Sequence, residues 1–221
     1  MCLELAGVAD LTIRSLLDKN QFSDPARLAE AAGVSPAMWP IFGVVWSSGR
    51  ILAEHVANLD LRDRRVLELG SGLALASLVL HRRGADITAS DIHPLAESFL
   101  FANTTLNGLT PIPFHTGSWS HDAPALGCFD LLIGSDVLYD PGHALALSAF
   151  IGNHAGRNAD VIIVDPNRGH RSVFRRLMAE RGFAVSVTRA PSRVFDGAAA
   201  FRGQILAFRR RAPAADLDDA A

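Results

Sequence analysis

The sequence predicts an α/β fold in which a doubly wound, mostly parallel sheet of seven strands carries helices on both faces. Three observations predict this fold. Short apolar runs alternate with amphipathic segments from residue 65 onward. Most of these runs are apolar at consecutive positions, which is typical of parallel strands buried on both faces. A glycine-containing turn, Gly70-Ser71-Gly72, joins the first run to the helical segment that follows it.

The apolar pattern also places the individual elements. Short runs rich in β-branched and aromatic residues predict strands over 65–69, 86–90, 112–115, 129–134, 161–164, 183–188 and 203–208. Apolar residues that recur at helical spacing predict helices around 51–59, 75–79, 95–106, 142–152 and 173–178. The range 112–115 is expected at an edge of the sheet, because Pro113 has no backbone N–H to donate.

The first forty residues are expected to form an N-terminal helical extension. Ile13, Leu16 and Leu17 have the spacing of one helix face. Asp24-Pro25 is typical of a helix start, and Gly33 is typical of a helix end. We place this extension over the mouth of a ligand site as a hypothesis, because residues 39–46 lead directly toward the first strand.

The predicted organisation has three parts: a helical extension over 1–40, a main domain over 41–208 and a disordered tail over 209–221. The tail is assigned from its low apolar content.

Composition narrows the function classes. The chain of 221 residues is 49% hydrophobic and 20% charged, which is typical of a globular protein with a substantial core. The formal net charge of −2 disfavours general nucleic-acid binding. With two cysteines, no secretion signal and no apolar run long enough to cross a bilayer, we expect a reduced, cytoplasmic protein that is not bound to a membrane. The histidines show no metal-ligand spacing, so no metal site is expected.

The strongest functional signal is the stretch from Val66 to Leu80. Gly70 and Gly72 allow the backbone to approach a ligand at the start of a helix, although a tight turn alone explains them too. Glu68 puts a carboxylate at the end of the strand, and Asp91 ends the second strand, where a carboxylate can accept both hydroxyls of a ribose. Leu75 replaces the third glycine of a dinucleotide fingerprint, which favours a ligand with a ribose and an amino acid but no phosphate.

These motifs resemble those of the class I, seven-stranded S-adenosylmethionine-dependent methyltransferases, which have a Rossmann-like fold. The resemblance runs from Trp39 to about Tyr139, and it is carried by VLELGSG, SDIHP, FANTTLNGL and SDVLYD. Within that family the chain is similar to the protein-lysine methyltransferase branch, which has a D-x-x-Y motif and includes the enzymes acting on valosin-containing protein and on the electron-transfer flavoprotein β subunit. Two positions depart from the pattern: Ser47 replaces a proline and Ser118 replaces an aspartate.

The resemblance implies a cofactor and a set of site residues. The cofactor is S-adenosyl-L-methionine, which leaves as S-adenosyl-L-homocysteine. The implied cofactor-binding residues are Trp46, Glu68, Gly70, Ser71, Gly72, Asp91, Ile92, Trp119 and Ser135. The implied catalytic residues are Asp136, which would hold the target ammonium, and Tyr139, which would bound the target channel. For Asp136 the alternative is a cap of the following helix, and for Tyr139 it is a packing role.

The expected function is therefore methyl transfer to a nitrogen, with a protein lysine side chain as the first candidate acceptor. A small metabolite or a nucleic acid is the alternative acceptor, and a non-catalytic cofactor-binding or interaction protein is the alternative class. A nucleic-acid base is disfavoured because SDVLY lacks the Pro-Pro of base-amino methyltransferases. The segment Asp165-Pro166-Asn167-Arg168 is interpreted first as a turn before a helix, with a substrate contact as the alternative. Nothing in the sequence indicates an oligomeric state.

Overall fold

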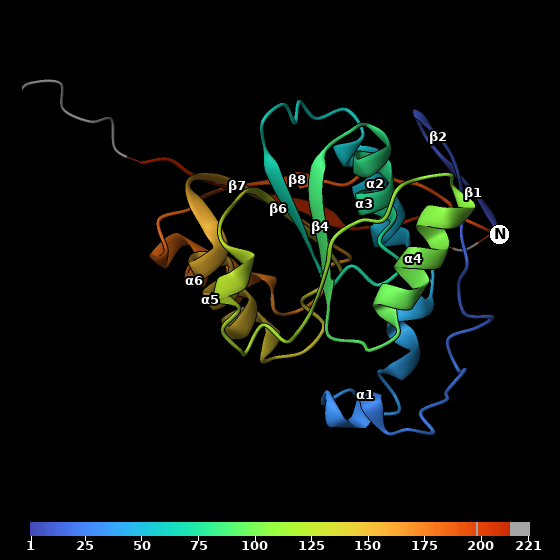
Figure 1. The fold of residues 1–221 in the computed structure, drawn as a ribbon. Coiled ribbons are helices and arrows are strands. Elements are labelled where there is room, and N and C mark those ends of the chain that lie inside the picture. Colours follow the sequence, from blue (N-terminus) through green and yellow to red (C-terminus); the bar gives the residue numbers. More distant parts are fainter. Residues whose placement is uncertain (198, 213–221) are drawn as a thin grey trace, which may run out of the picture.

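The chain forms a sheet between two layers of helices in the computed structural model, which describes residues 1–197 and 199–212 (Figure 1). The strands of the sheet are β3 (Arg65–Leu69), β4 (Asp86–Asp91), β5 (Phe114–Thr116), β6 (Phe129–Ser135), β7 (Ala155–Asp165), β8 (Ala184–Arg189) and β9 (Gln204–Arg210). They lie in the order β5-β4-β3-β6-β7-β9-β8. Strand β9 runs antiparallel to both of its neighbours, whereas the pairs from β5 to β7 are parallel.

Helices cover both faces of this sheet (Figure 1). They are α2 (Ser47–Val56), α3 (Leu75–Arg82), α4 (Ala96–Leu106), α5 (His143–His154) and α6 (Arg171–Glu180). Helices α2, α3 and α4 lie on one side, and α5 and α6 lie on the other. The predicted doubly wound α/β fold is confirmed, and its helices and strands fall close to the predicted ranges.

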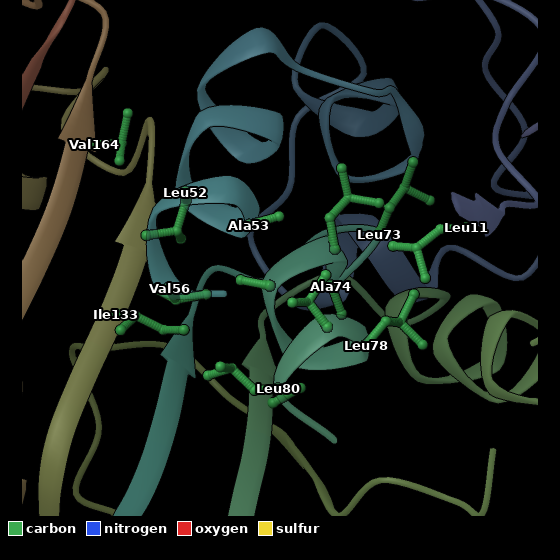
Figure 2. Close-up of a cluster of buried hydrophobic side chains, with 14 of the residues drawn as sticks. Leu11, Leu52, Ala53, Val56, Leu73, Ala74, Leu78, Leu80, Ile133 and Val164 are labelled. Carbon is green, nitrogen blue, oxygen red and sulfur yellow. The ribbon is translucent and has the colours of Figure 1, made fainter. Parts of the chain in front are cut away.

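Two hydrophobic clusters follow from the alternation of side chains along the strands. In β3, Val66 joins the cluster under α2, α3 and α4, whereas Leu67 and Leu69 join the cluster under α5 and α6. This period of two is the geometry of a strand that is buried on both faces. Figure 2 shows part of the first cluster, in which Leu52 of α2 and Ile133 of β6 are both buried.

The prediction of a helical N-terminal extension is wrong over its first part. Strands β1 (Cys2–Leu5) and β2 (Val8–Thr12) form an antiparallel hairpin instead. Its buried residues alternate with exposed ones, and Leu11 packs into the same cluster as α2 and α3 (Figure 2). The period of two therefore describes this segment, and the helical spacing of Ile13, Leu16 and Leu17 was coincidental.

The rest of the extension contains one short helix. Helix α1 (Leu28–Ala31) begins later than Asp24-Pro25, but the Asp24 Oδ2 accepts a hydrogen bond from the backbone N–H of Glu30 at 3.0 Å. Gly33 follows the helix at φ +83°, as predicted for a helix end. A 3₁₀ turn, η1 (Trp39–Gly43), then leads into α2.

The C-terminal boundary also differs from the prediction. Arg209 and Arg210 belong to β9, so the predicted tail begins too early. The part of that prediction over 213–221 lies outside the described residues. Within the described residues, no helix has the combination of length and apolar character that a bilayer crossing requires.

Candidate active site

A cavity of about 580 Å³ opens at the carboxyl ends of β3, β4 and β6. The chain passes from β3 to β4 on one side and reaches β6 on the other, so the strand order reverses here. Such a reversal is where open α/β sheets bind ligands. Every residue predicted from the sequence to bind cofactor or to act in catalysis lines this cavity: Trp46, Glu68, Gly70, Ser71, Gly72, Asp91, Ile92, Trp119, Ser135, Asp136 and Tyr139. Their individual roles stay predictions.

The glycine turn after β3 has no room for side chains. Gly70 and Gly72 have φ values of +58° and +53°, in the left-handed region that favours glycine. A Cβ on Gly72 would lie 2.8 Å from the backbone oxygen of Phe42. A Cβ on Gly70 would lie 3.3 Å from the Trp119 ring. The turn therefore packs directly against η1 and against the aromatic wall of the cavity.

Asp91 holds this turn from the neighbouring strand. Its Oδ2 accepts a hydrogen bond from the Gly72 N–H at 2.8 Å, and its Oδ1 accepts one from the His93 N–H at 2.8 Å. Burial raises the pKa of the Asp91 carboxyl, while the hydrogen bonds from backbone N–H groups act to lower it. Each carboxylate oxygen has a further lone pair, so Asp91 retains acceptor capacity toward the cavity.

Glu68 lies beneath the same turn. Its carboxylate accepts hydrogen bonds from the backbone N–H and the hydroxyl of Ser77, in the first turn of α3. Glu68 therefore satisfies one of the free N–H groups at a helix start. Burial raises the pKa of this carboxyl to about 7, although both hydrogen bonds from Ser77 oppose that shift. The partner of Glu68 is thus a backbone amide at the start of α3.

The residues between Gly33 and Trp46 form another wall of the cavity. The Trp46 ring N–H donates to the Ile41 backbone oxygen at 2.8 Å, which fixes this indole at the start of α2. Within the predicted extension over 1–40, Gly33, Val34 and Met38 belong to this segment, so the hypothesis that the extension lies over the ligand site fits these residues. This segment is mostly turns and 3₁₀ helix, and the hairpin packs elsewhere.

Asp136 lies on the opposite side of the cavity, directly after β6. It has φ +52°, and its N–H donates to the Val164 backbone oxygen at 2.9 Å. Its two carboxylate oxygens accept from the Nε and Nη2 of Arg168 at 2.8 and 2.9 Å. Asp136 does not cap α5, because the Oδ1 of Asp140 accepts the hydrogen bond from Gly142 near the start of that helix.

Tyr139 stands beside Asp136 in the cavity wall. Its ring contacts His143 edge to face, with ring centroids 4.6 Å apart. Burial, and then the negative charges of Asp91 and Asp136, raise the pKa of the Tyr139 hydroxyl to about 12. The hydroxyl therefore keeps its proton at neutral pH and can donate a hydrogen bond. In the part of the chain that the structure describes, no group of three or more metal-ligating side chains occurs.

Comparison with known proteins places this geometry in a family. The lysine methyltransferase family matches residues 37–180, which is more than half of the chain. The chain belongs to the lysine methyltransferase family. The resemblance inferred from the sequence motifs is thereby confirmed at the level of the family.

Two curated mouse proteins illustrate the relationship. The electron transfer flavoprotein beta subunit lysine methyltransferase is 32% identical over 143 residues, which cover 63% of this chain and 55% of that protein. The protein N-lysine methyltransferase METTL21A is 27% identical over 158 residues, which cover 66% of this chain and 70% of that protein. The chain thus spans little more than half the length of the first of these relatives.

Solved structures share the fold of this family member at low sequence identity. A ribosomal protein L11 methylase from Lactobacillus delbrueckii subsp. bulgaricus has a TM-score of 0.58 at 20% identity, covering 74% of this chain and 78% of that one. A magnesium protoporphyrin IX methyltransferase from Synechocystis, solved with bound S-adenosylmethionine, has a TM-score of 0.57 at 21% identity, covering 72% and 76%. At this identity the likeness establishes the fold alone.

Several residues of this family member's site have no clear signal in the sequence. Phe42 and His93 stack in the wall with ring centroids 3.7 Å apart, and burial lowers the pKa of His93 to about 4. Arg168 also lines the cavity, although a turn was the first interpretation of its segment. The turn is real, because the Oδ1 of Asp165 accepts from the Arg168 N–H at 2.8 Å, but the Arg168 side chain continues to Asp136.

Proposed function

We propose that this protein is an S-adenosylmethionine-dependent methyltransferase that methylates lysine side chains of a protein substrate. The observation that carries the proposal is one cavity with two unlike sides. The glycine turn and Asp91 form one side, and Asp136 and Tyr139 form the other. Membership of the lysine methyltransferase family supports the reaction type, and the names of the curated relatives support a protein acceptor.

The residues on the first side fit a cofactor that carries a ribose and an amino acid. The cavity volume of about 580 Å³ is within the range of sites for ligands of this size. The glycine turn lines the cavity with backbone, without Cβ atoms at Gly70 and Gly72, and Asp91 has free acceptor capacity for ribose hydroxyls. Ser71 adds a buried hydroxyl that lines the cavity and has no hydrogen-bond partner among the described residues. Trp46 and Trp119 supply apolar walls for the methionine and adenine parts.

The second side fits an amine acceptor. When bound, S-adenosylmethionine supplies an electrophilic methyl group. The new N–C bond forms as the C–S bond breaks, and the nitrogen loses a proton to solvent. Asp136 accepts a hydrogen bond from the acceptor nitrogen and orients its lone pair, while Tyr139 limits the channel and donates one hydrogen bond. No covalent enzyme intermediate is needed, so catalysis consists of positioning and electrostatics.

The place of action is a separate proposal. We infer a cytoplasmic protein, as the sequence predicts. Cys2 and Cys128, the cysteines of the chain, are both free and exposed, which is consistent with a reducing compartment.

The experiment that tests the function is transfer of a labelled methyl group from S-adenosylmethionine to a cell lysate. We expect label in macromolecules that protease releases and nuclease does not, recovered as methylated lysine after acid hydrolysis. Asp136→Asn is the matched negative control, because it keeps the side-chain shape at the acceptor side. Label in nuclease-sensitive material or in small molecules would instead support the alternative acceptors. Absence of label together with tight cofactor binding by calorimetry would support a non-catalytic binding protein.

A further inference from the structure

The carboxylate assigned to the acceptor is already paired in this structure. The Arg168 guanidinium engages both oxygens of Asp136, at 2.8 and 2.9 Å. The Asp136 side chain is only 13% exposed and that of Arg168 is 43% exposed, so the pair spans from the cavity wall toward solvent. A bidentate pair of this kind is geometrically specific, which distinguishes it from an incidental surface ion pair.

The turn after β7 fixes where this guanidinium lies. The Asp165 carboxylate is fully buried and accepts the Arg168 N–H through its Oδ1. Asn167, at φ +71°, donates from its side chain to the Arg202 backbone oxygen and accepts from Arg171 at 2.8 Å. The arginine is therefore presented by a turn that is anchored on both sides, and its position is built into the fold.

We propose that Arg168 is an electrostatic positioning residue that keeps the acceptor nitrogen unprotonated by neutralising Asp136 and placing a cation at the acceptor end of the cavity. This inference rests on the proposed function. Two of the roughly four acceptor positions of the Asp136 carboxylate remain after Arg168 has bound. A neutral amine can therefore still donate to Asp136.

The reaction explains why such a residue is useful. Only an amine with a free lone pair can attack, and a lysine with its ordinary pKa of about 10.4 is almost fully protonated at neutral pH. A bare carboxylate in the cavity would favour the ammonium form further, whereas a neighbouring cation disfavours it. Pairing Asp136 with Arg168 keeps the hydrogen-bond acceptor and removes the net negative charge that would hold the proton.

Other titratable and charged groups around the pair must be considered in any pH experiment. They come from β3, β4, the loop after β6, the start of α5 and the β7–α6 turn: Glu68, Asp91, Tyr139, Asp140, His143, Asp165, His170 and Arg171. Tyr139, with its pKa of about 12, stays neutral up to pH 9.5. Burial lowers the pKa of His143, so its ring is also neutral between pH 8 and 9.5, the range of the experiment below. Glu68, with a pKa of about 7, titrates below this range and is present in all the variants.

The test measures binding of n-butylamine, a lysine side-chain analogue, to protein saturated with S-adenosylhomocysteine, by calorimetry between pH 8 and 9.5. This readout needs no turnover, and the product cofactor carries no sulfonium charge of its own. If wild type binds the neutral amine, its apparent affinity rises about tenfold per pH unit below the amine pKa. We expect that slope for wild type and a change of less than about twofold per unit for Arg168→Met, which would bind the ammonium form.

Two variants complete the experiment. Arg168→Lys retains the charge and should restore most of the slope, which separates electrostatics from a folding defect. Arg176→Met removes an exposed arginine of α6 that pairs with Glu180 and should behave as wild type. Equal slopes for wild type and Arg168→Met would overturn the proposal. Tighter binding by Arg168→Met with an unchanged slope would overturn it too, because it would mean that Arg168 only blocks the acceptor site and is displaced when the amine binds. Failure of n-butylamine to bind either protein would overturn it as well, whereas the proposed function stands or falls on methyl-lysine in the labelled lysate.

Discussion

The two sides of the cavity hold their carboxylates in different ways. On the glycine-turn side, Asp91 and Glu68 are bound by backbone N–H groups of Gly72, His93 and Ser77. On the acceptor side, Asp136 is bound by a side chain, the guanidinium of Arg168. Removal of a carboxylate that binds backbone amides disturbs the packing of the fold, whereas removal of one that binds a half-exposed side chain leaves the backbone hydrogen bonds intact. Changes on the first side should therefore alter stability and cofactor affinity together, and changes on the second should alter turnover alone.

The largest expected effect is on the acceptor side. Asp136→Asn should lower turnover by about 1000-fold and leave cofactor affinity within about twofold, because the Arg168-paired carboxylate that accepts from the acceptor nitrogen and orients it is lost. Asparagine tolerates the left-handed conformation at this position, so little backbone strain is added. Asp86→Asn, at the end of β4 that lies away from the cavity, makes the same chemical change at an exposed site and serves as the control. A parallel loss of cofactor binding in Asp136→Asn would show that the two sides are not separable.

Gly72→Ala tests the glycine-turn side. The new Cβ would collide with the Phe42 backbone oxygen, and the alanine would have to adopt a left-handed φ. We therefore expect a loss of about 3 kcal/mol in the free energy of unfolding. Cofactor affinity should fall by more than about tenfold in the same variant. Gly84→Ala has a similar φ of +79° with open space around it, and should cost only about 1 kcal/mol. Denaturant unfolding and calorimetry measure both quantities, and equal losses in the two variants would contradict the close packing of the turn.

Glu68, on the glycine-turn side of the cavity, should make the stability of the protein depend on pH. Its folded-state pKa of about 7 exceeds the ordinary value of 4.5, so between these pH values the folded protein holds a proton that the unfolded chain has lost. Stability therefore falls as pH rises through this window. Glu68→Gln keeps an acceptor for Ser77 and cannot titrate, so wild type should lose about 2–3 kcal/mol relative to it between pH 5 and pH 8. Glu97→Gln makes the same chemical change at an exposed site on α4 and serves as the control.

The smallest expected effect belongs to Tyr139→Phe. Removal of the hydroxyl leaves the ring contact with His143, so stability should change by less than about 0.5 kcal/mol. Turnover should fall by about tenfold, which corresponds to one hydrogen bond to the acceptor. Steady-state kinetics on the labelled acceptor measure this change. Unaltered turnover would leave Tyr139 with a packing role only.

The sheet and the cofactor side were predictable because their determinants are local. The segment from Val66 to Asp91 contains the strands, the glycine turn and both carboxylates within one continuous stretch. The order of side chains along a buried strand then decides which residues reach the cavity. This is why the local pattern predicted Glu68, the glycine turn and Asp91 around one cavity, whereas the other site residues were predicted from the family resemblance.

The features that the sequence did not predict depend on contacts between residues that are far apart in the chain. The Asp136–Arg168 pair joins residues 32 positions apart, and no local pattern marks the partner of a lone arginine.

The N-terminal hairpin was missed for a different reason. Leu3, Leu5, Leu11 and Ile13 alternate with a period of two, but a helical spacing that begins at Ile13 overlaps the same segment. Packing against α2 and α3 decided between the two patterns.

The antiparallel position of β9 has a consequence for biosynthesis. Strand β8 leaves the ribosome before β9, yet within the described residues its hydrogen-bonded strand neighbour is β9 alone. The nascent chain can thus assemble β3 to β7 early, while β8 must wait for residues 204–210 to emerge and to insert between it and β7. A ribosome that stalls before that point would hold a chain with an open apolar edge, which is a natural target for chaperones.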